Sequence, residues 1–128
     1  VIGRSRIVGM PLSLMLAAKG SDATVSIVHS RTENIEALCQ QADVLIAAVG
    51  VAGLVKKNWV KNGAVVIDVG VNRVDNMSQE RGWSLVGDVA SEVSEVASIL
   101  SPVPGGVGPM TIAMLMSNTV RAAEMTLE

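Results

Sequence analysis

Two uninterrupted apolar runs constrain the fold of this chain more than any other feature. Val44 to Val49 reads VLIAAV, and Ala64 to Val69 contains a single polar residue, Asp68. Strands that are buried on both faces of a parallel sheet show such continuous runs, whereas half-exposed strands alternate apolar and polar residues. Each run ends at a glycine. We therefore expect two buried parallel strands.

Shorter extended and helical segments alternate around these two runs. Extended segments are predicted at Val1–Ile2, Ala23–Val28, Trp83–Val86 and Ile99–Ser101, and a polar surface excursion at Asn72–Gly82. Helices are predicted from Ile7 or Val8 to Lys19, from a Ser30/Glu33 capping box to Gln41, at Lys57–Val60, weakly at Ser91–Ala97, and at Thr111–Met125. The first helix is apolar nearly all round, so it is expected to be covered on more than one side. This order predicts an α/β fold: a Rossmann-like, doubly wound, mainly parallel sheet with helices on both faces.

Length and composition exclude several classes of protein. The chain has 128 residues, about one domain, and a formal net charge of −2 with no basic run, so neither nucleic acid nor an anionic membrane is an expected partner. One cysteine and one histidine exclude an internal disulfide and a Cys/His metal site, and they suit a reducing, cytoplasmic compartment. No apolar run approaches the roughly 18 residues of a membrane span. The chain starts without Met and with Val1 and Ile2 as its whole first strand, which predicts a fragment with a truncated strand.

The first turn has the local plan of a phosphate site. Gly3 follows the strand, and Gly9 lies where the first helix begins, in the pattern GxSxxxG. Free N–H groups at a helix N-terminus, with glycines that let an anion come close, bind phosphate. The pattern meets the dinucleotide fingerprint GxGxxG only in part, so an ordinary strand-to-helix turn is the alternative.

The residues after the second strand favour NADP over NAD. An NAD site usually places Asp or Glu there, on the ribose hydroxyls, whereas this chain places Ser30 and Arg31. A hydroxyl and a guanidinium suit a 2′-phosphate, and Arg4 projects from the first turn toward the same region. In the alternative interpretation Ser30 is a helix cap and Arg31 a solvated surface residue.

A proline- and glycine-rich loop, PVPGGVGPMT, precedes the closing helix at Pro102 to Thr111. Glycines remove side chains where a ligand approaches the backbone, and the prolines restrict the loop. A tight loop that merely closes the fold explains one or two of these residues, not six. All the loops that are candidate binding sites follow predicted strands. In such sheets ligands bind at the carboxyl ends of the strands.

The chain resembles the bifunctional methylenetetrahydrofolate dehydrogenase/methenyltetrahydrofolate cyclohydrolases of one-carbon folate metabolism. The resemblance is carried by PGGVGPMT, by GRSxIVGxP, by HSRT after the second strand, by DVGxN at Asp68 to Asn72, and by GDV at Gly87 to Val89. These motifs occur in the family's order along the whole chain. They imply the C-terminal, NADP-binding half of such an enzyme.

The resemblance also implies roles for single residues. Gly3, Arg4 and Ser5 would line the cofactor phosphates, Ser30 would meet the 2′-phosphate, and Val71 would touch the nicotinamide side. The full set of expected cofactor-binding residues is Gly3, Arg4, Ser5, Ile7, Ser30, Arg31, Gly50 and Val71; the expected folate-binding residues are Pro104, Gly105, Gly106, Val107 and Gly108. No metal is expected.

The implied reactions are oxidation of 5,10-methylenetetrahydrofolate with NADP and hydrolysis of the product to 10-formyltetrahydrofolate. The family's Tyr-xxx-Lys pair lies in its N-terminal folate-binding domain, and this chain contains no tyrosine. We therefore expect the catalytic residues in that absent domain, no activity from this chain alone, and a homodimer formed through this half. The alternatives are a non-catalytic NADP-sensing module and the cofactor domain of an unrelated NADP dehydrogenase.

Overall fold

The computed structural model describes residues 1–127, and its centre is a parallel sheet. The strands β1 (Val44–Ala47), β2 (Val65–Asp68) and β5 (Ile99–Leu100) lie in the order β1-β2-β5. Beside β1, Ile2 forms parallel bridges to Ala47 on one side and to Val28 on the other. Across the sheet the order is thus Val28, Ile2, β1, β2 and β5.

The chain reverses its direction of travel across the sheet beside Ile2. From Ile2 it crosses to Val28 on one side, and it then returns to β1 on the other side. Such a reversal is a topological switch point, and the carboxyl ends of the two strands that flank it form the usual ligand crevice of an open α/β sheet. The two strands approach so closely that a Cβ on Gly3 would lie 2.3 Å from the Ala48 carbonyl oxygen.

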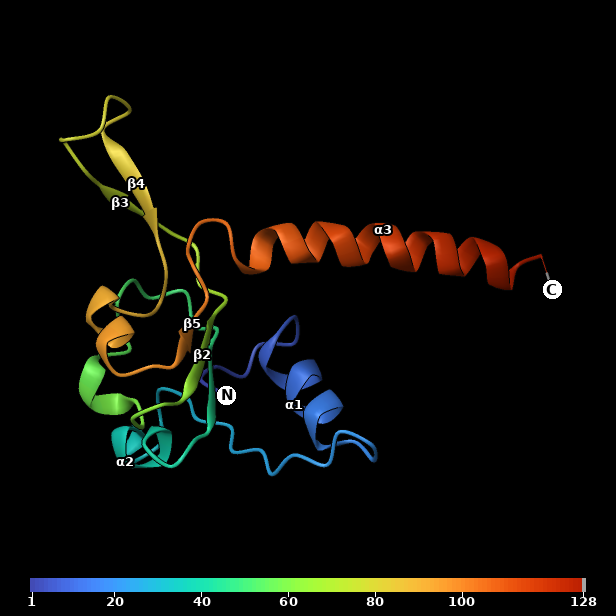
Figure 1. The fold of residues 1–128 in the computed structure, drawn as a ribbon, viewed down its shortest axis with the longest axis horizontal. Coiled ribbons are helices and arrows are strands. Elements are labelled where there is room, and N and C mark those ends of the chain that lie inside the picture. Colours follow the sequence, from blue (N-terminus) through green and yellow to red (C-terminus); the bar gives the residue numbers. More distant parts are fainter. Residues whose placement is uncertain (128) are drawn as a thin grey trace.

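Helices cover both faces of the sheet, as predicted. Helix α1 (Gly9–Ala17) lies on one side, and α2 (Ile35–Cys39) lies on the other with the short 3-10 helices η1 (Lys57–Trp59) and η2 (Ser91–Glu95) (Figure 1). Right-handed crossovers explain this division, because the crossover before the reversal and those after it run in opposite directions. The predicted Rossmann-like, doubly wound α/β fold is confirmed.

The core lies between the sheet and the helices α2, η1 and η2. Its most buried large side chains include Ile2, Leu45, Val55, Val66 and Val93. Aliphatic residues build most of this core, together with Cys39, and Trp59 packs against it as the one aromatic contributor within residues 1–127.

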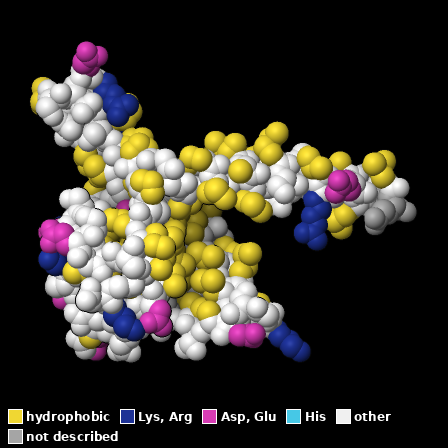
Figure 2. All heavy atoms as spheres, in the orientation of Figure 1, with side chains coloured by type: hydrophobic (Ala, Val, Ile, Leu, Met, Phe, Trp, Pro, Cys, Tyr) yellow, Lys and Arg dark blue, Asp and Glu magenta, His cyan; other side chains and the backbone are white. Residues whose placement is uncertain are grey.

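Helix α3 (Val107–Met125) extends away from the body, and none of its residues is buried (Figure 1). Apolar side chains line it and continue on the body beneath it (Figure 2). Those of α3 are Met110, Ile112, Met114, Leu115, Met116, Val120 and Met125. No helix within residues 1–127 is long and apolar enough to cross a membrane.

A β-ribbon occupies most of the predicted polar excursion. Strands β3 (Asn72–Asp75) and β4 (Trp83–Val86) pair antiparallel and project from the body (Figure 1). The guanidinium groups of Arg73 and Arg81 lie 4.7 and 4.4 Å from the centre of the Trp83 ring. The sequence predicted β4 but not β3, because Val74 is the only apolar residue of β3 and gives no alternating apolar pattern.

Three local predictions were wrong. Ala23–Val28 forms a single bridge at Val28, because its neighbour within residues 1–127 is the short segment that ends at Gly3. Helix α2 starts after Asn34, which has a positive φ, and Ser30 does not cap it. Helix α1 is largely exposed: Gly9 and Ser13 are its buried residues, because little of the described chain packs on its outer side.

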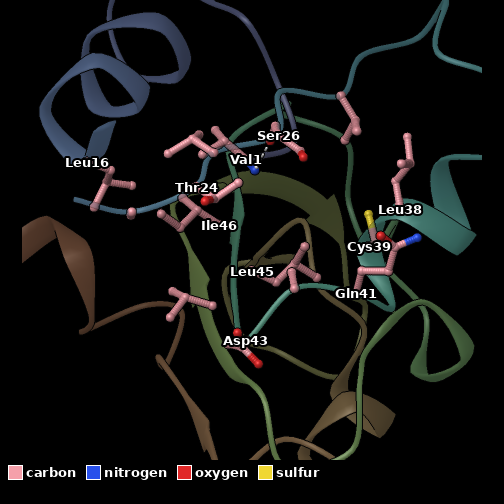
Figure 3. A pocket seen from close by; sticks show the side chains of 15 residues that line it. Val1, Leu16, Thr24, Ser26, Leu38, Cys39, Gln41, Asp43, Leu45 and Ile46 are labelled. Atoms are coloured by element: carbon pink, nitrogen blue, oxygen red, sulfur yellow. Dashed lines mark hydrogen bonds between the residues drawn. The ribbon is translucent and has the colours of Figure 1, made fainter. Parts of the chain in front are cut away.

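A cavity of about 550 Å³ opens at the amino-terminal ends of the strands (Figure 3). It lies between the extended segment 23–28 and β1, and Val1, Cys39 and Leu45 are among its lining residues. Burial raises the pKa of the Cys39 thiol, so this cysteine behaves as a small apolar side chain. The cavity lies at the opposite edge from the switch-point loops.

Two glycines in the first turns of α1 and α3 provide a matched test of the packing at the switch point. A Cβ on Gly9 would lie 2.2 Å from the Gly3 carbonyl oxygen, whereas a Cβ on Gly108 would meet no atom within 4 Å. We expect Gly9→Ala to lower the free energy of unfolding by about 1–3 kcal/mol. Gly108→Ala should raise it by about 0.5 kcal/mol. Urea unfolding of both variants measures the difference, and equal effects would contradict the packing described here.

Candidate functional site

The predicted site residues meet along one edge of the sheet. Ser30 and Arg31 follow the segment that ends at Val28, Gly3 to Ile7 follow Ile2, and Gly50 follows β1. Val71 follows β2, and Pro104 to Gly108 follow β5. Because the strands are parallel, all five loops lie at their carboxyl ends, in the same order as the strands.

Ser5 organises the first turn. Its hydroxyl oxygen accepts hydrogen bonds from the N–H groups of Val8 (3.1 Å) and Gly9 (3.3 Å), and its carbonyl accepts one from Met10 (2.9 Å). The serine thus caps α1 from the position where GxGxxG has its second glycine. Three N–H groups at the N-terminus of the helix are therefore satisfied within the protein.

Other donors of the turn remain free for a ligand. Within residues 1–127, the N–H groups of residues 4–7 have no protein acceptor, and these residues are exposed. Arg4 forms no ion pair with any described residue. Unpaired N–H groups next to a helix N-terminus and a free guanidinium together suit an anionic phosphate. These unpaired N–H groups precede the helix rather than belonging to its first turn.

The structure decides against the capping interpretation of Ser30. The Thr32 hydroxyl accepts a hydrogen bond from the His29 N–H (3.0 Å), and His29 Nδ1 accepts one from the Arg31 N–H (3.2 Å). These bonds fold residues 29–32 into a closed turn in which His29 has a structural role. Within the described residues the Ser30 side chain has no hydrogen-bond partner and is exposed. Its hydroxyl is free to bind a ligand.

Gly50 and Val71 lie in two loops that are both hydrogen-bonded to one buried carboxylate. Asp88, which is 0% exposed, accepts hydrogen bonds from the N–H groups of Val49, Gly50 and Val51 at 2.7, 2.9 and 3.0 Å. It also accepts one from the Asn72 side-chain amide at 2.9 Å. The N–H of Gly50 therefore points to Asp88 and is not available to a cofactor. Val71, by contrast, is 62% exposed at this edge, although it is apolar.

A second buried carboxylate, that of Asp68, fixes the segment that carries Asp88. It accepts hydrogen bonds from the N–H groups of Gly70 (2.9 Å), Asp88 (3.0 Å) and Val89 (2.9 Å). A Cβ on Gly70 would lie 2.1 Å from an Asp88 carboxylate oxygen, and one on Gly87 would lie 1.8 Å from an Asp68 oxygen. The motifs DVGxN and GDV thus pack against each other and are joined by these hydrogen bonds.

The loop after β5 and the first turn of α3 contain glycines with different structural roles. Gly105 has φ +102°, and a Cβ on Gly106 would lie 2.4 Å from the Pro102 carbonyl oxygen, so both serve the loop's own conformation. Gly108 has no such steric reason within the described chain. The absence of a side chain there leaves room for a ligand at the last strand of the row.

Sequence reasoning missed the roles of Asp68, Asn72 and Asp88. DVGxN and GDV were noted for the resemblance that they carry, without any function for their polar residues. The available signal was an aspartate within two residues of a glycine at two strand ends. Among residues 1–127 no group of His, Cys, Asp and Glu is arranged to hold a metal ion.

Together, these features define a class of protein. A doubly wound sheet whose switch point carries a glycine turn, unpaired N–H groups and free basic side chains is a dinucleotide-binding domain.

Comparison with known proteins identifies the family to which this domain belongs. Residues 1–127 match the family "Tetrahydrofolate dehydrogenase/cyclohydrolase, NAD(P)-binding domain", and the chain belongs to this family.

Similar proteins are longer than this chain. "Bifunctional protein FolD" of Lawsonia intracellularis is 59% identical over 127 residues, which cover 96% of this chain and 42% of that protein. "Bifunctional protein FolD 4, chloroplastic" of Arabidopsis thaliana is 58% identical over 97% of this chain and 34% of its own length. The chain therefore spans well under half of these relatives.

Solved structures agree in fold. The methylenetetrahydrofolate dehydrogenase-cyclohydrolase of Trypanosoma brucei, solved with NADP cofactor and inhibitor, superposes with a TM-score of 0.88 at 42% identity, covering 99% of this chain and 43% of that one. The corresponding Campylobacter jejuni enzyme gives 0.87 at 47% identity, covering 98% and 42%.

Substitutions at Ser5 separate its capping role from binding of phosphate. Ser5→Asp retains an acceptor for the N–H groups of Val8 and Gly9, so stability should change little, whereas its charge should repel phosphate and weaken dinucleotide binding at least tenfold. Ser5→Ala should lower the free energy of unfolding by about 1 kcal/mol, because it removes the cap. Calorimetric titration and urea unfolding measure the two effects. Unchanged binding by Ser5→Asp would show that no phosphate lies at this turn.

Proposed function

We propose that this chain is the cofactor-binding part of an enzyme that oxidises 5,10-methylenetetrahydrofolate to 5,10-methenyltetrahydrofolate with NADP. The same enzyme would hydrolyse the methenyl product to 10-formyltetrahydrofolate. The observation that carries the proposal is the row of loops along one sheet edge. It starts at the free Ser30 hydroxyl, passes the first turn and the exposed Val71, and ends at Gly108.

This row matches the order of chemical groups in the proposed complex. Ser30, Arg31 and Arg4 would bind the 2′-phosphate, and the N–H groups of the first turn would bind the diphosphate. Val71 would contact the nicotinamide, and residues 104–108 would border the folate. When it is bound, the cofactor accepts the hydride from the folate methylene carbon. The protein orients the two reactants and excludes water from the contact between them.

The proposal of NADP rather than NAD rests on the loop that contains Ser30, at the start of the row. No carboxylate takes the place where an NAD site has one, and Ser30 is neither a helix cap nor otherwise engaged within the described residues. A serine hydroxyl next to arginine side chains stabilises a dianionic phosphate through charge-assisted hydrogen bonds.

We further propose that the catalytic residues lie in an N-terminal folate-binding domain outside this chain. The support is that the relatives are more than twice as long and that α3 presents apolar side chains with no buried residue. That domain would cover α3. A homodimer would form through this half, with the β3–β4 ribbon as its contact, and the single cysteine suits a cytoplasmic location.

Substitutions at the proposed 2′-phosphate site should weaken the preference for NADP over NAD. Ser30→Asp and Arg4→Ala should each raise the Kd for NADP tenfold or more while changing the Kd for NAD less than threefold, because NAD lacks the 2′-phosphate. Calorimetric titration of both cofactors measures this, and Arg6→Ala provides a matched control arginine in the same turn. Equal losses for the two cofactors would refute the 2′-phosphate assignment.

The activity itself is tested with the full-length protein that contains this chain. We expect NADP-dependent formation of methenyltetrahydrofolate, seen as a rise in its absorbance, and its hydrolysis in the absence of NADP. We also expect thermal stabilisation by NADP and, separately, by a folate analogue. A clear NADP shift with no folate shift and no turnover would contradict the proposed substrate and favour a sensing module.

A further inference from the structure

We propose that Asp88 is a positioning residue for the dehydrogenase reaction, because its single carboxylate sets the spacing of the two loops that flank the nicotinamide position. This inference rests on the proposed function and adds a residue that touches neither cofactor nor substrate. The two loops are residues 49–51, after β1, and residues 70–72, after β2.

The carboxylate is saturated by donors from both loops. One oxygen accepts the N–H groups of Val49 and Gly50, and the other accepts the Val51 N–H and the Asn72 amide. Successive N–H groups that converge on one anion form a backbone nest, and the positive φ of Gly50 (+71°) is typical of one. In dinucleotide-binding loops such a nest receives a ligand anion, whereas here the protein supplies the anion itself.

Two features show that this carboxylate belongs to a fixed assembly. The segment that carries it is held by Asp68, and the same segment binds the chain beyond β1 through Val55 N–H to Asp88 O (3.0 Å) and Gly53 N–H to Gly87 O (3.0 Å). A Cβ on Gly70 would also collide with the Asp88 carboxylate, and one on Gly87 would collide with the Asp68 carboxylate. Loss of the Asp88 carboxylate contacts would therefore allow the two loops to move relative to each other.

The position of the two loops explains why their spacing matters. Val71 lies between Gly70, which abuts Asp88, and Asn72, which donates to it. A small misplacement of a positioned reactant lowers the rate of a bimolecular reaction steeply, about a hundredfold for 1 Å. The hydrolysis step needs no cofactor, so it does not depend on the nicotinamide position. Loss of the Asp88 contacts should therefore affect the two activities unequally.

Asp88→Asn in the full-length protein tests this inference. The amide oxygen can accept from fewer donors than the carboxylate, and the amide NH₂ faces N–H groups, so the two loops are released without a change of size. We expect the KM for NADP to rise at least tenfold, and the ratio of dehydrogenase to cyclohydrolase kcat/KM to fall at least tenfold. Val93→Ala, a fully buried substitution in η2 outside both loops, is the control and should leave that ratio within twofold of the wild type.

A milder variant keeps the test decisive if Asp88→Asn does not fold. Asn72→Ala removes one of the four donors and releases residues 70–72 alone, so the ratio should fall about threefold or more. A ratio that stays at the wild-type value in whichever variants fold would overturn the positioning role, because a merely structural residue lowers both activities together. A wild-type protein that catalyses neither reaction would instead contradict the proposed function.

Discussion

Two buried aspartates without a cationic partner hold the functional edge of this domain together. Asp68 and Asp88 are 3% and 0% exposed, and neither forms an ion pair within residues 1–127. Their charges are compensated by backbone N–H groups and by one amide, which are dipoles that the fold itself orients. Burying a carboxylate is costly unless it is hydrogen-bonded, so the loops after β1 and β2 can adopt few conformations that keep both groups satisfied.

In this arrangement the N–H groups that hold the loops in place are different from those that are free at the surface. The donors of residues 49–51 point inward to Asp88, whereas those of residues 4–7 have no protein acceptor. One loop is thus held in place by its own hydrogen bonds, whereas the other has N–H groups that are free for the proposed cofactor. The contrast follows from chemistry, because a site that must bind and release a charged cofactor cannot have its recognition donors already occupied.

The apolar surface of the chain has a separate meaning. Helices α1 and α3 expose methionine, leucine and isoleucine side chains on the side of the sheet where α1 is the main cover (Figures 1 and 2). Exposed apolar areas of this extent are typical of interaction surfaces, such as those between domains or subunits. Since the chain spans less than half of its relatives, the proposed N-terminal domain would cover that surface, and the reacting groups would then lie between the two parts.

The sequence alone determined the class of fold and predicted the edge proposed for ligand binding, because continuous apolar runs and glycine-terminated strands are local signals. It also placed Ser30, Val71 and residues 104–108 at strand ends. It did not determine that Ser30 leaves α2 uncapped, since that depends on the competing turn closed by His29 and Thr32. Nor did it reveal that Gly50 donates inward to Asp88, because the two are joined by contacts 38 residues apart. Long-range hydrogen bonds and close backbone approaches arise only when the strands are assembled, so tertiary structure decided which polar groups are free to bind and which hold the site in place.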